Sequence, residues 1–128
     1  MKDNRITIQI ETPVQKLFEY TINPKNTPKW IESIVKEETN EWPVRIGTVY
    51  KNQNKLGKWS EYSVADLKTN EIFKLVSKDK NYHVRYTYIS LGKNTSTLEY
   101  YEWVDKGEIE EPFSQEVLKK LKLLLERR

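Results

Sequence analysis

The sequence predicts an α+β fold in which a curved antiparallel sheet of about six or seven strands wraps around a C-terminal helix. Three observations predict it. A strand with strict alternation opens the chain over residues 5–11 and is followed by two short helical segments that end near Trp30. About six strand-like stretches then run from Ile34 to Asp105, and one amphipathic helix closes the chain from Phe113 onward. A curved sheet with one substantial helix on one face tends to leave an interior space, and interior spaces bind ligands.

The first third of the chain predicts one strand and two short helices. Three isoleucines alternate with polar residues, which is the period of a half-buried strand: Ile6, Ile8 and Ile10. Thr12-Pro13 is typical of an N-cap followed by proline at the first helical position, and the helix that it predicts ends at Asn23-Pro24. Thr27-Pro28 repeats this start signal and predicts a second, very short helix over residues 28–33.

The middle of the chain predicts antiparallel strands joined by tight turns. We expect strands over residues 34–41, 47–52, 59–67, 71–77, 82–91 and 95–104. Gly57 lies in one of the connections, where it can take the positive φ that a short hairpin loop needs. Closely spaced turns without intervening helices favour antiparallel pairing of sequential strands over parallel βαβ units.

The last helix is expected to begin around Glu111-Pro112, where acidic residues lie near the positive end of the helix dipole. Six apolar side chains form a stripe along it: Phe113, Val117, Leu118, Leu121, Leu124 and Leu125. We expect this stripe to pack against the concave face of the sheet. Its burial would contribute on the order of ten kcal/mol before the entropy cost of ordering.

The composition predicts one domain spanning residues 1–128. The chain is 37% hydrophobic and 32% charged, and its aromatic content of 12% includes eight tyrosines and four tryptophans. Large flat side chains with polar groups suit cavity walls as well as close packing. The chain has no cysteine, which excludes disulfides, thiol nucleophiles and thiolate metal sites.

The charge and hydropathy patterns disfavour some partners. A net charge of +3 is too weak to indicate nucleic-acid binding, and no apolar run approaches the ~20 residues that cross a bilayer. The N-terminal residues Met1 to Arg5 lead directly into a strand and lack the apolar core of a signal peptide. We therefore expect a cytoplasmic protein that binds neither nucleic acid nor membrane.

Four short motifs, taken in order, are similar to those of a known superfamily. They are Ile8-Gln9-Ile10-Glu11-Thr12-Pro13-Val14-Gln15-Lys16-Leu17-Phe18, Pro28-Lys29-Trp30, Ile46-Gly47-Thr48-Val49-Tyr50 and Thr97-Leu98-Glu99-Tyr100. They resemble, in this order, four parts of the START-like (SRPBCC) superfamily. These parts are the opening strand with its helix, the short second helix, the glycine that opens the third strand, and the start of the last strand. That superfamily has the helix-grip fold and includes Bet v 1-type, polyketide cyclase/dehydrase-type and Aha1-type proteins. The resemblance covers most of the chain. It implies the helix-grip fold and the binding of a ligand. It indicates no subgroup, and the closing helix is shorter than in many members, which would leave the cavity open at one end.

The alternation of side chains along the two longest strands identifies one carboxylate as a candidate catalytic group. On the strand over residues 82–91, the more apolar face is expected to point toward the helix: Tyr82, Val84, Tyr86 and Tyr88. On the last strand the family pattern places Leu98 and Tyr100 inward, which brings Glu102 inward too. Glu102 is therefore a weak candidate for a catalytic acid or base. The alternative is a glutamate that is exposed at an edge or paired across strands.

Other chemistry has less support. His83 is the only histidine, and its position in the alternation of its strand places its side chain toward solvent. The sequence also lacks the spacing of His and Glu residues that is typical of a metal site, so we expect no metal and no cofactor. No Gly-x-Ser-x-Gly sequence and no glycine-rich phosphate loop are present.

The aromatic residues could also simply fill the core. Stacking on single-stranded nucleic acid would need them on a basic surface, whereas they alternate into strands.

The function that the sequence predicts best is binding of a small hydrophobic or aromatic molecule, such as a lipid, a polyketide or a similar metabolite. The expected site lies between the sheet and the C-terminal helix, with walls from Trp30, Phe73, Tyr86, Tyr88 and Tyr100 and a helical side from Leu121 and Leu125. Two alternatives stay open. One is a cyclase- or hydratase-type enzyme that uses the same cavity, and the other is an Aha1-type protein-interaction (co-chaperone) domain that uses the outer face of the sheet or the helix surface.

Overall fold

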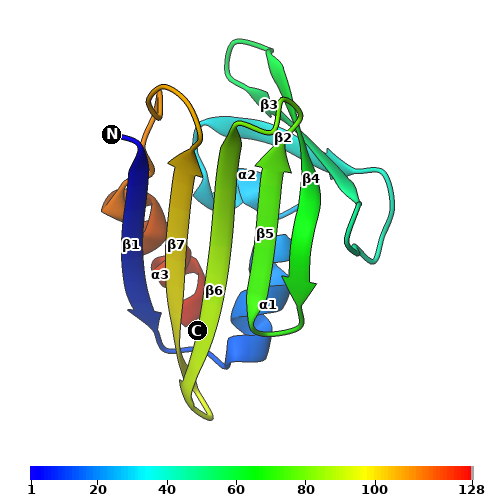
Figure 1. The fold of residues 1–128 in the computed structure, drawn as a ribbon. Helices are drawn as coiled ribbons and strands as arrows, with labels where there is room; N and C mark the ends of the chain where they lie inside the picture. Colours follow the sequence, from blue (N-terminus) through cyan, green and yellow to red (C-terminus); the bar gives the residue numbers. More distant parts are fainter. Residues whose placement is uncertain (128) are drawn as a thin grey trace.

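Seven antiparallel strands form a curled sheet, and three helices lie on its concave side (Figure 1). The structure is a computed structural model that describes residues 1–127. The strands are β1 (Asp3–Ile10), β2 (Ile34–Thr39), β3 (Val49–Asn54), β4 (Trp59–Lys68), β5 (Ile72–Ser77), β6 (Tyr82–Gly92) and β7 (Thr95–Val104). The helices are α1 (Val14–Ile22), α2 (Thr27–Trp30) and α3 (Gln115–Glu126).

The strand order is β1-β7-β6-β5-β4-β3-β2. Strands β2 to β7 pair with their neighbours in sequence because short turns join them, and Gly57 in the β3–β4 turn has a φ of +83°. β1 pairs with β7 at the far edge, since α1 and α2 carry the chain across the concave side before β2 begins. The α+β helix-grip architecture predicted from the sequence is confirmed.

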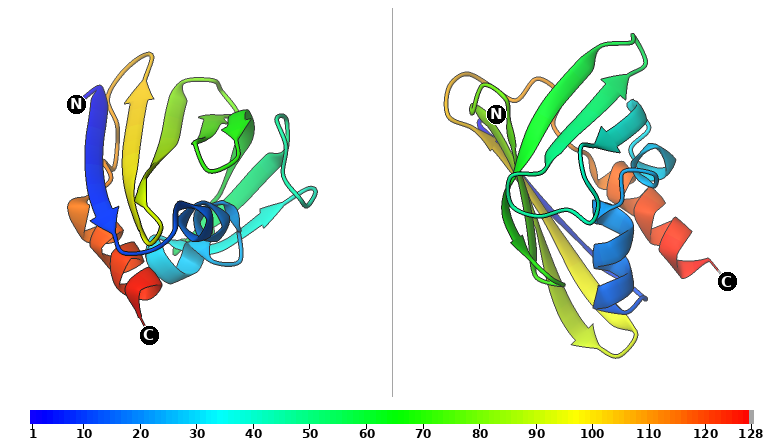
Figure 2. Two further views of the ribbon diagram at one scale, coloured as in Figure 1. Left: turned by 90° about the horizontal axis from the view of Figure 1, so that it is seen from below. Right: turned by 90° about the vertical axis from the view of Figure 1, so that its right-hand side faces the viewer.

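The three helices share the concave side of the sheet (Figure 2). α1 contacts β6 and β7, α2 contacts β2 and α3, and α3 packs mainly against β1. Leu118 and Leu121 of α3 are fully buried, and the rest of its apolar stripe is partly buried. The C-terminal helix therefore covers the β1 edge of the concave side, and α1 and α2 cover part of what remains.

Three predicted helix boundaries were wrong. Thr12 is no N-cap: α1 begins at Val14, and Thr12 is buried with its carbonyl accepting a hydrogen bond from the Ser96 hydroxyl at 2.9 Å. α2 ends at Trp30, since Ile31 already has extended backbone angles. α3 begins at Gln115 rather than near residue 111, and the Phe113 N–H, two residues before the helix, donates to a carboxylate on β7.

The predicted faces of β6 and β7 agree with the burial of their side chains. On β6, Val84, Tyr86 and Tyr88 are buried and Tyr82 is partly buried. On β7, alternate residues from Ser96 to Glu102 are buried, with Leu98 and Glu102 almost completely so. Together with Leu17, Trp30 and the leucines of α3, these side chains form the core.

Candidate functional site

A cavity of about 1130 Å³ opens on the concave side of the sheet, away from β1. Strands β2 to β6 and Tyr100 of β7 form its floor and far wall, and the segment from Val104 to Phe113 forms the near wall. Ile31 and Thr27 contribute from α2 and the turn that follows it. The cavity is open to solvent because α3 covers the β1 edge of the sheet and does not reach this half.

Aromatic rings in mutual contact line the cavity. Phe73 lies with its ring centroid 5.5 Å from that of Tyr86, and Tyr86 meets Tyr100 edge to face at 5.2 Å. Tyr100 in turn stacks on Phe113 with centroids 3.9 Å apart. Tyr50 joins the other end of this row at 5.5 Å from Phe73. The row gives the cavity a continuous apolar wall that extends from β3 to the segment before α3.

The seven residues predicted to contact a ligand divide into two groups. Phe73, Tyr86 and Tyr100 line the cavity. The other four lie behind its wall or outside it: Trp30, Tyr88, Leu121 and Leu125.

Trp30 and Tyr88 belong to the packed core. Trp30 is fully buried and meets Tyr86 edge to face at 6.3 Å, so it supports the cavity wall from behind. The Tyr88 hydroxyl lies 2.7 Å from that of Thr21, which fixes its ring against α1. Leu121 and Leu125 lie on α3, and α3 packs at the β1 edge of the sheet, outside the cavity lining.

Glu102 is buried on the inward face of β7, and its carboxylate is engaged by three donors of the chain. Oε1 accepts a hydrogen bond from the Tyr82 hydroxyl at 2.6 Å. Oε2 accepts from Asn4 Nδ2 at 2.8 Å and from the Phe113 N–H at 2.6 Å. Glu102 therefore ties β1, β6 and the segment before α3 to β7, and it is absent from the cavity lining.

A different carboxylate, that of Glu37 on β2, lines the cavity. Glu37 Oε1 accepts a hydrogen bond from the Thr27 hydroxyl at 2.6 Å, and Oε2 accepts a longer one from Asn52 Nδ2 at 3.4 Å. Burial raises the pKa of Glu37 to about 7, against the lowering effect of these two hydrogen bonds. The carboxyl group therefore changes its protonation state near neutral pH.

Sequence reasoning missed Glu37 because of an irregularity in β2. Strict alternation from Ile34 would place Glu37 on the face opposite to Ile34. The pairing of β2 with β3 shifts register between Ile34 and Lys36, and this bulge returns Glu37 to the cavity side. Both Ile34 and Glu37 consequently line the cavity. No residue in the sequence signals the bulge.

Three phenol groups, from β3, β4 and β6, line the same cavity as Glu37. Burial raises the pKa values of Tyr50, Tyr62 and Tyr86, and the charge of Glu37 adds to the effect at each. The Tyr50 hydroxyl donates to the Ile22 carbonyl at 2.6 Å and so caps the end of α1. The Tyr86 hydroxyl has no hydrogen-bond partner among residues 1–127, although its side chain is only 6% exposed. Tyr86 thus offers an unpaired polar group at the cavity wall.

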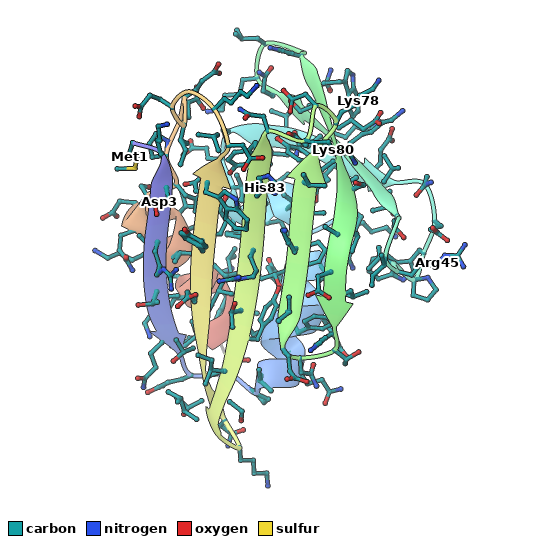
Figure 3. The ribbon with its side chains drawn as sticks, in the orientation of Figure 1. Met1, Asp3, Arg45, Lys78, Lys80 and His83 are labelled. Atoms are coloured by element: carbon teal, nitrogen blue, oxygen red, sulfur yellow. The ribbon has the colours of Figure 1, made fainter. Side chains whose placement is uncertain are left out.

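His83 lies on the outer face of the sheet, the face that Figure 3 shows. Its ring stacks on Trp103 with centroids 4.8 Å apart, and Nε2 lies 2.9 Å from Asp105 Oδ2. Within the part of the chain that the structure describes, no group of three His, Asp or Glu side chains could hold a metal ion. None of the helices in this part has the length and apolar character needed to cross a membrane.

Comparison with known proteins identifies the fold. No protein-family model matches the sequence, and no curated protein matches it. Solved structures that are similar include a START superfamily protein from Mycobacterium smegmatis, with a TM-score of 0.75, 11% identity and 99% of each chain covered. The Aha1 dimer from Colwellia psychrerythraea is similar with a TM-score of 0.71 and 13% identity, over 99% of this chain and 98% of that one. Protein XoxI from Bacillus cereus matches with a TM-score of 0.76 and 14% identity, over 98% of this chain and 96% of that one. The chain has a START-like fold, and its subgroup is unassigned.

Proposed function

We propose that this protein binds a small hydrophobic or aromatic molecule in the cavity between β2–β6 and the segment before α3. The observation that carries the proposal is the cavity itself, whose volume of about 1130 Å³ suffices for a molecule of several rings. Phe73, Tyr86 and Tyr100 would form the apolar wall, and Glu37 would be the polar group that orients the ligand. The START-like fold of the similar structures supports a cavity-based role by analogy of fold only.

A binding titration tests this proposal. 1-Naphthylmethanol, a neutral bicyclic probe, is expected to quench the intrinsic fluorescence of the protein saturably and to raise its melting temperature. A ligand at 100 times its Kd stabilises a protein by about 2.7 kcal/mol, which thermal denaturation detects easily in a chain of this size. Native mass spectrometry of the protein purified from its host would additionally show a retained apolar molecule.

Two tryptophan substitutions provide the matched comparison. Leu75→Trp adds a ring on the cavity side of β5, whereas Ile89→Trp adds the same ring at a side chain of β6 that is 46% exposed. We expect the first to weaken probe binding at least tenfold and the second to leave it unchanged. Equal binding by both variants and the wild type, with near-UV circular dichroism showing that each is folded, would contradict the proposal.

One observation favours a second candidate, a cyclase- or hydratase-type enzyme that uses the same cavity. Glu37, with its pKa raised by burial to about 7, lines the same cavity as Tyr86, and such a carboxyl group can give or take a proton near neutral pH. For this candidate, Glu37→Gln would abolish turnover of an unsaturated polyketide-like substrate and leave its Kd nearly unchanged. Under binding alone, no turnover would be found in the wild type.

The Aha1-type interaction alternative concerns the outer face of the sheet. There Arg5 lies over the ring of Tyr101 at 4.3 Å, and Lys74 lies over that of Trp103 at 5.1 Å. These two aromatic rings of the outer face are thus paired with cations of the chain itself. The cavity is accordingly the better-supported site.

A further inference from the structure

We infer that the ligand of this cavity is a protonated amine on a hydrophobic or aromatic body, held with its ammonium group between the Glu37 carboxylate and the Tyr86 hydroxyl. The inference rests on the proposed function and narrows it to one chemical class. Three observations carry it: the charges that line the cavity, the free hydrogen-bonding capacity of these two groups, and the rings beside them.

The charge around the cavity is opposite in sign to that of the whole chain. The chain carries a net charge of +3. Seven carboxylate side chains line the cavity, against three lysines (Lys51, Lys58 and Lys78), and no arginine or histidine of residues 1–127 is among the lining residues. The three lysines are exposed at the rim, where Lys51 also lies 3.9 Å from Glu61. Such a lining attracts cations and gives the charge of an anionic ligand no buried partner.

The two groups that would hold the ammonium have room for it. Each oxygen of Glu37 accepts one hydrogen bond, from Thr27 and from Asn52, and a carboxylate oxygen can accept a second. The Tyr86 hydroxyl is unpaired among residues 1–127, and its oxygen can accept an ammonium N–H. Glu102 cannot play this role, since it does not line the cavity and its carboxylate already accepts hydrogen bonds from Tyr82, Asn4 and Phe113.

The surrounding rings suit a cation with an apolar body. Phe73 and Tyr86 lie 5.5 Å apart in the cavity wall, and an ammonium near a ring face gains further electrostatic attraction. The hydrocarbon part of the ligand would rest on Leu75 and Val84, which also line the cavity. A neutral ligand would use these rings but would leave Glu37 without a counterion.

Binding should depend on pH through Glu37. The titratable groups on which its charge acts are phenols that line the same cavity, namely Tyr50 from β3, Tyr62 from β4 and Tyr86 from β6, and burial raises the pKa of each, so they stay neutral. α2 contributes the Thr27 hydroxyl, and its Lys29 is exposed. With a Glu37 pKa of about 7, the carboxyl is ionised at pH 8 and protonated at pH 5. Amine affinity should therefore fall as pH decreases through 7, by about tenfold in all, because protonation removes the same charge as the Glu37→Gln substitution.

Three probes with one bicyclic body test the inference: 1-naphthylmethylamine, 1-naphthylmethanol and 1-naphthoate. Isothermal titration at pH 8 is expected to rank the amine at least tenfold tighter than the alcohol, and the alcohol tighter than the carboxylate. At pH 5 the amine should lose this advantage, while the alcohol should bind as it does at pH 8.

Glu37→Gln is the decisive variant, because it keeps the shape of the side chain and removes its charge. It should reduce amine affinity about tenfold at pH 8, abolish the pH dependence and leave the alcohol unchanged. Glu71→Gln is the matched control, since it removes one charge from an exposed side chain outside the cavity lining and should alter none of the three probes.

The outcomes separate this inference from the function on which it rests. Binding of all three probes with equal affinity, or tightest binding of 1-naphthoate, would overturn the amine assignment and leave small-molecule binding standing. Tight amine binding that Glu37→Gln does not weaken would also overturn it, because the charge would then lie elsewhere. Failure of every probe to bind the folded protein would overturn both.

Discussion

Two glutamates on the concave side of the sheet differ in what their oxygens already bind. Glu102 accepts three hydrogen bonds from the chain itself and lies outside the cavity lining. Glu37 accepts two, one of them long, and lines the cavity. A buried carboxylate that donors of the chain engage away from a cavity stabilises the fold, whereas one that lines a cavity and keeps free acceptor sites can bind a ligand.

Replacement of Glu102 by alanine should therefore reduce stability. The change would leave the Phe113 N–H without its acceptor, and it would remove the shorter of the two hydrogen bonds of the Tyr82 hydroxyl and one of the two of the Asn4 amide. Each buried donor left unpaired costs about 1–3 kcal/mol, and the loss of a hydrogen bond to a charged group adds about 1.5–3 kcal/mol. We expect the free energy of unfolding in urea to fall by about 3 kcal/mol or more. Glu99→Ala, on the outer face of the same strand, removes a 3.5 Å ion pair with Arg5 and should cost less than about 1 kcal/mol. Equal losses for the two variants would argue against a structural role for Glu102.

Glu37 should make the ligand-free protein less stable as pH rises. Its pKa is about 7 in the folded chain and 4.5 as the ordinary value, so the unfolded chain releases the proton first. The stability that the protonated form confers is complete below pH 4.5 and is lost as pH rises through 7. Glu37→Gln does not titrate, and its stability relative to the wild type should increase by about 2–3 kcal/mol between pH 5 and pH 8. Parallel urea-denaturation results for the two proteins across this range would contradict the assignment.

The C-terminal helix acts at the scale of an element by closing the β1 edge of the sheet. Leu118 and Leu121 are fully buried there, and α3 packs mainly against β1 and α2. Because Leu121 lies outside the cavity lining, its packing serves stability and not ligand contact.

Truncation of Leu121 should separate stability from binding. Leu121→Ala is expected to lower the free energy of unfolding by about 2–5 kcal/mol, since it leaves a cavity in the packed core. Leu123→Ala, at a side chain of the same helix that is 70% exposed, should change it by less than about 0.5 kcal/mol. Isothermal titration of both folded variants should give the same Kd for 1-naphthylmethanol as the wild type. A weaker Kd for Leu121→Ala alone would mean that α3 contributes to the ligand site after all.

The elements differ in how well the sequence predicts them. β6 and β7 are regular over the region that lines the core, so alternation alone predicted the inward faces that carry Tyr86, Tyr100 and Glu102. β2 contains a bulge near its start, and a register shift of one residue exchanges the two faces of a strand. Because of that shift, alternation could not predict that the Glu37 side chain lies on the cavity side. The start of α3 was likewise predicted too early, since the segment before Gln115 is not helical and contacts β7 through the hydrogen bond from Phe113 to Glu102.

The whole molecule shows why the cavity lies where it does. The sheet curls over β2 to β5, and three helices share its concave side, so a short α3 at the β1 edge leaves the opposite half uncovered (Figure 2). The sequence predicted an interior space from the imbalance between a long sheet and one substantial helix. It did not predict which half of the sheet would remain open, because that depends on tertiary packing of α1, α2 and α3 against one another.

The distribution of charge over the whole molecule leads to a last prediction, on ionic strength. The acidic side chains at the cavity rim are mostly exposed, so salt screens their attraction for a cation once the Debye length falls from about 30 Å at 0.01 M to well under 10 Å at 0.5 M. The Kd of 1-naphthylmethylamine at pH 8 should therefore rise about three- to tenfold over this range, while that of 1-naphthylmethanol should stay constant. Glu37→Gln should retain part of the salt dependence, since the rim carboxylates remain, even though it loses the pH dependence. Identical salt responses for the amine and the alcohol would show that the acidic rim does not attract the ligand, and would leave Glu37 as the sole source of any preference for amines.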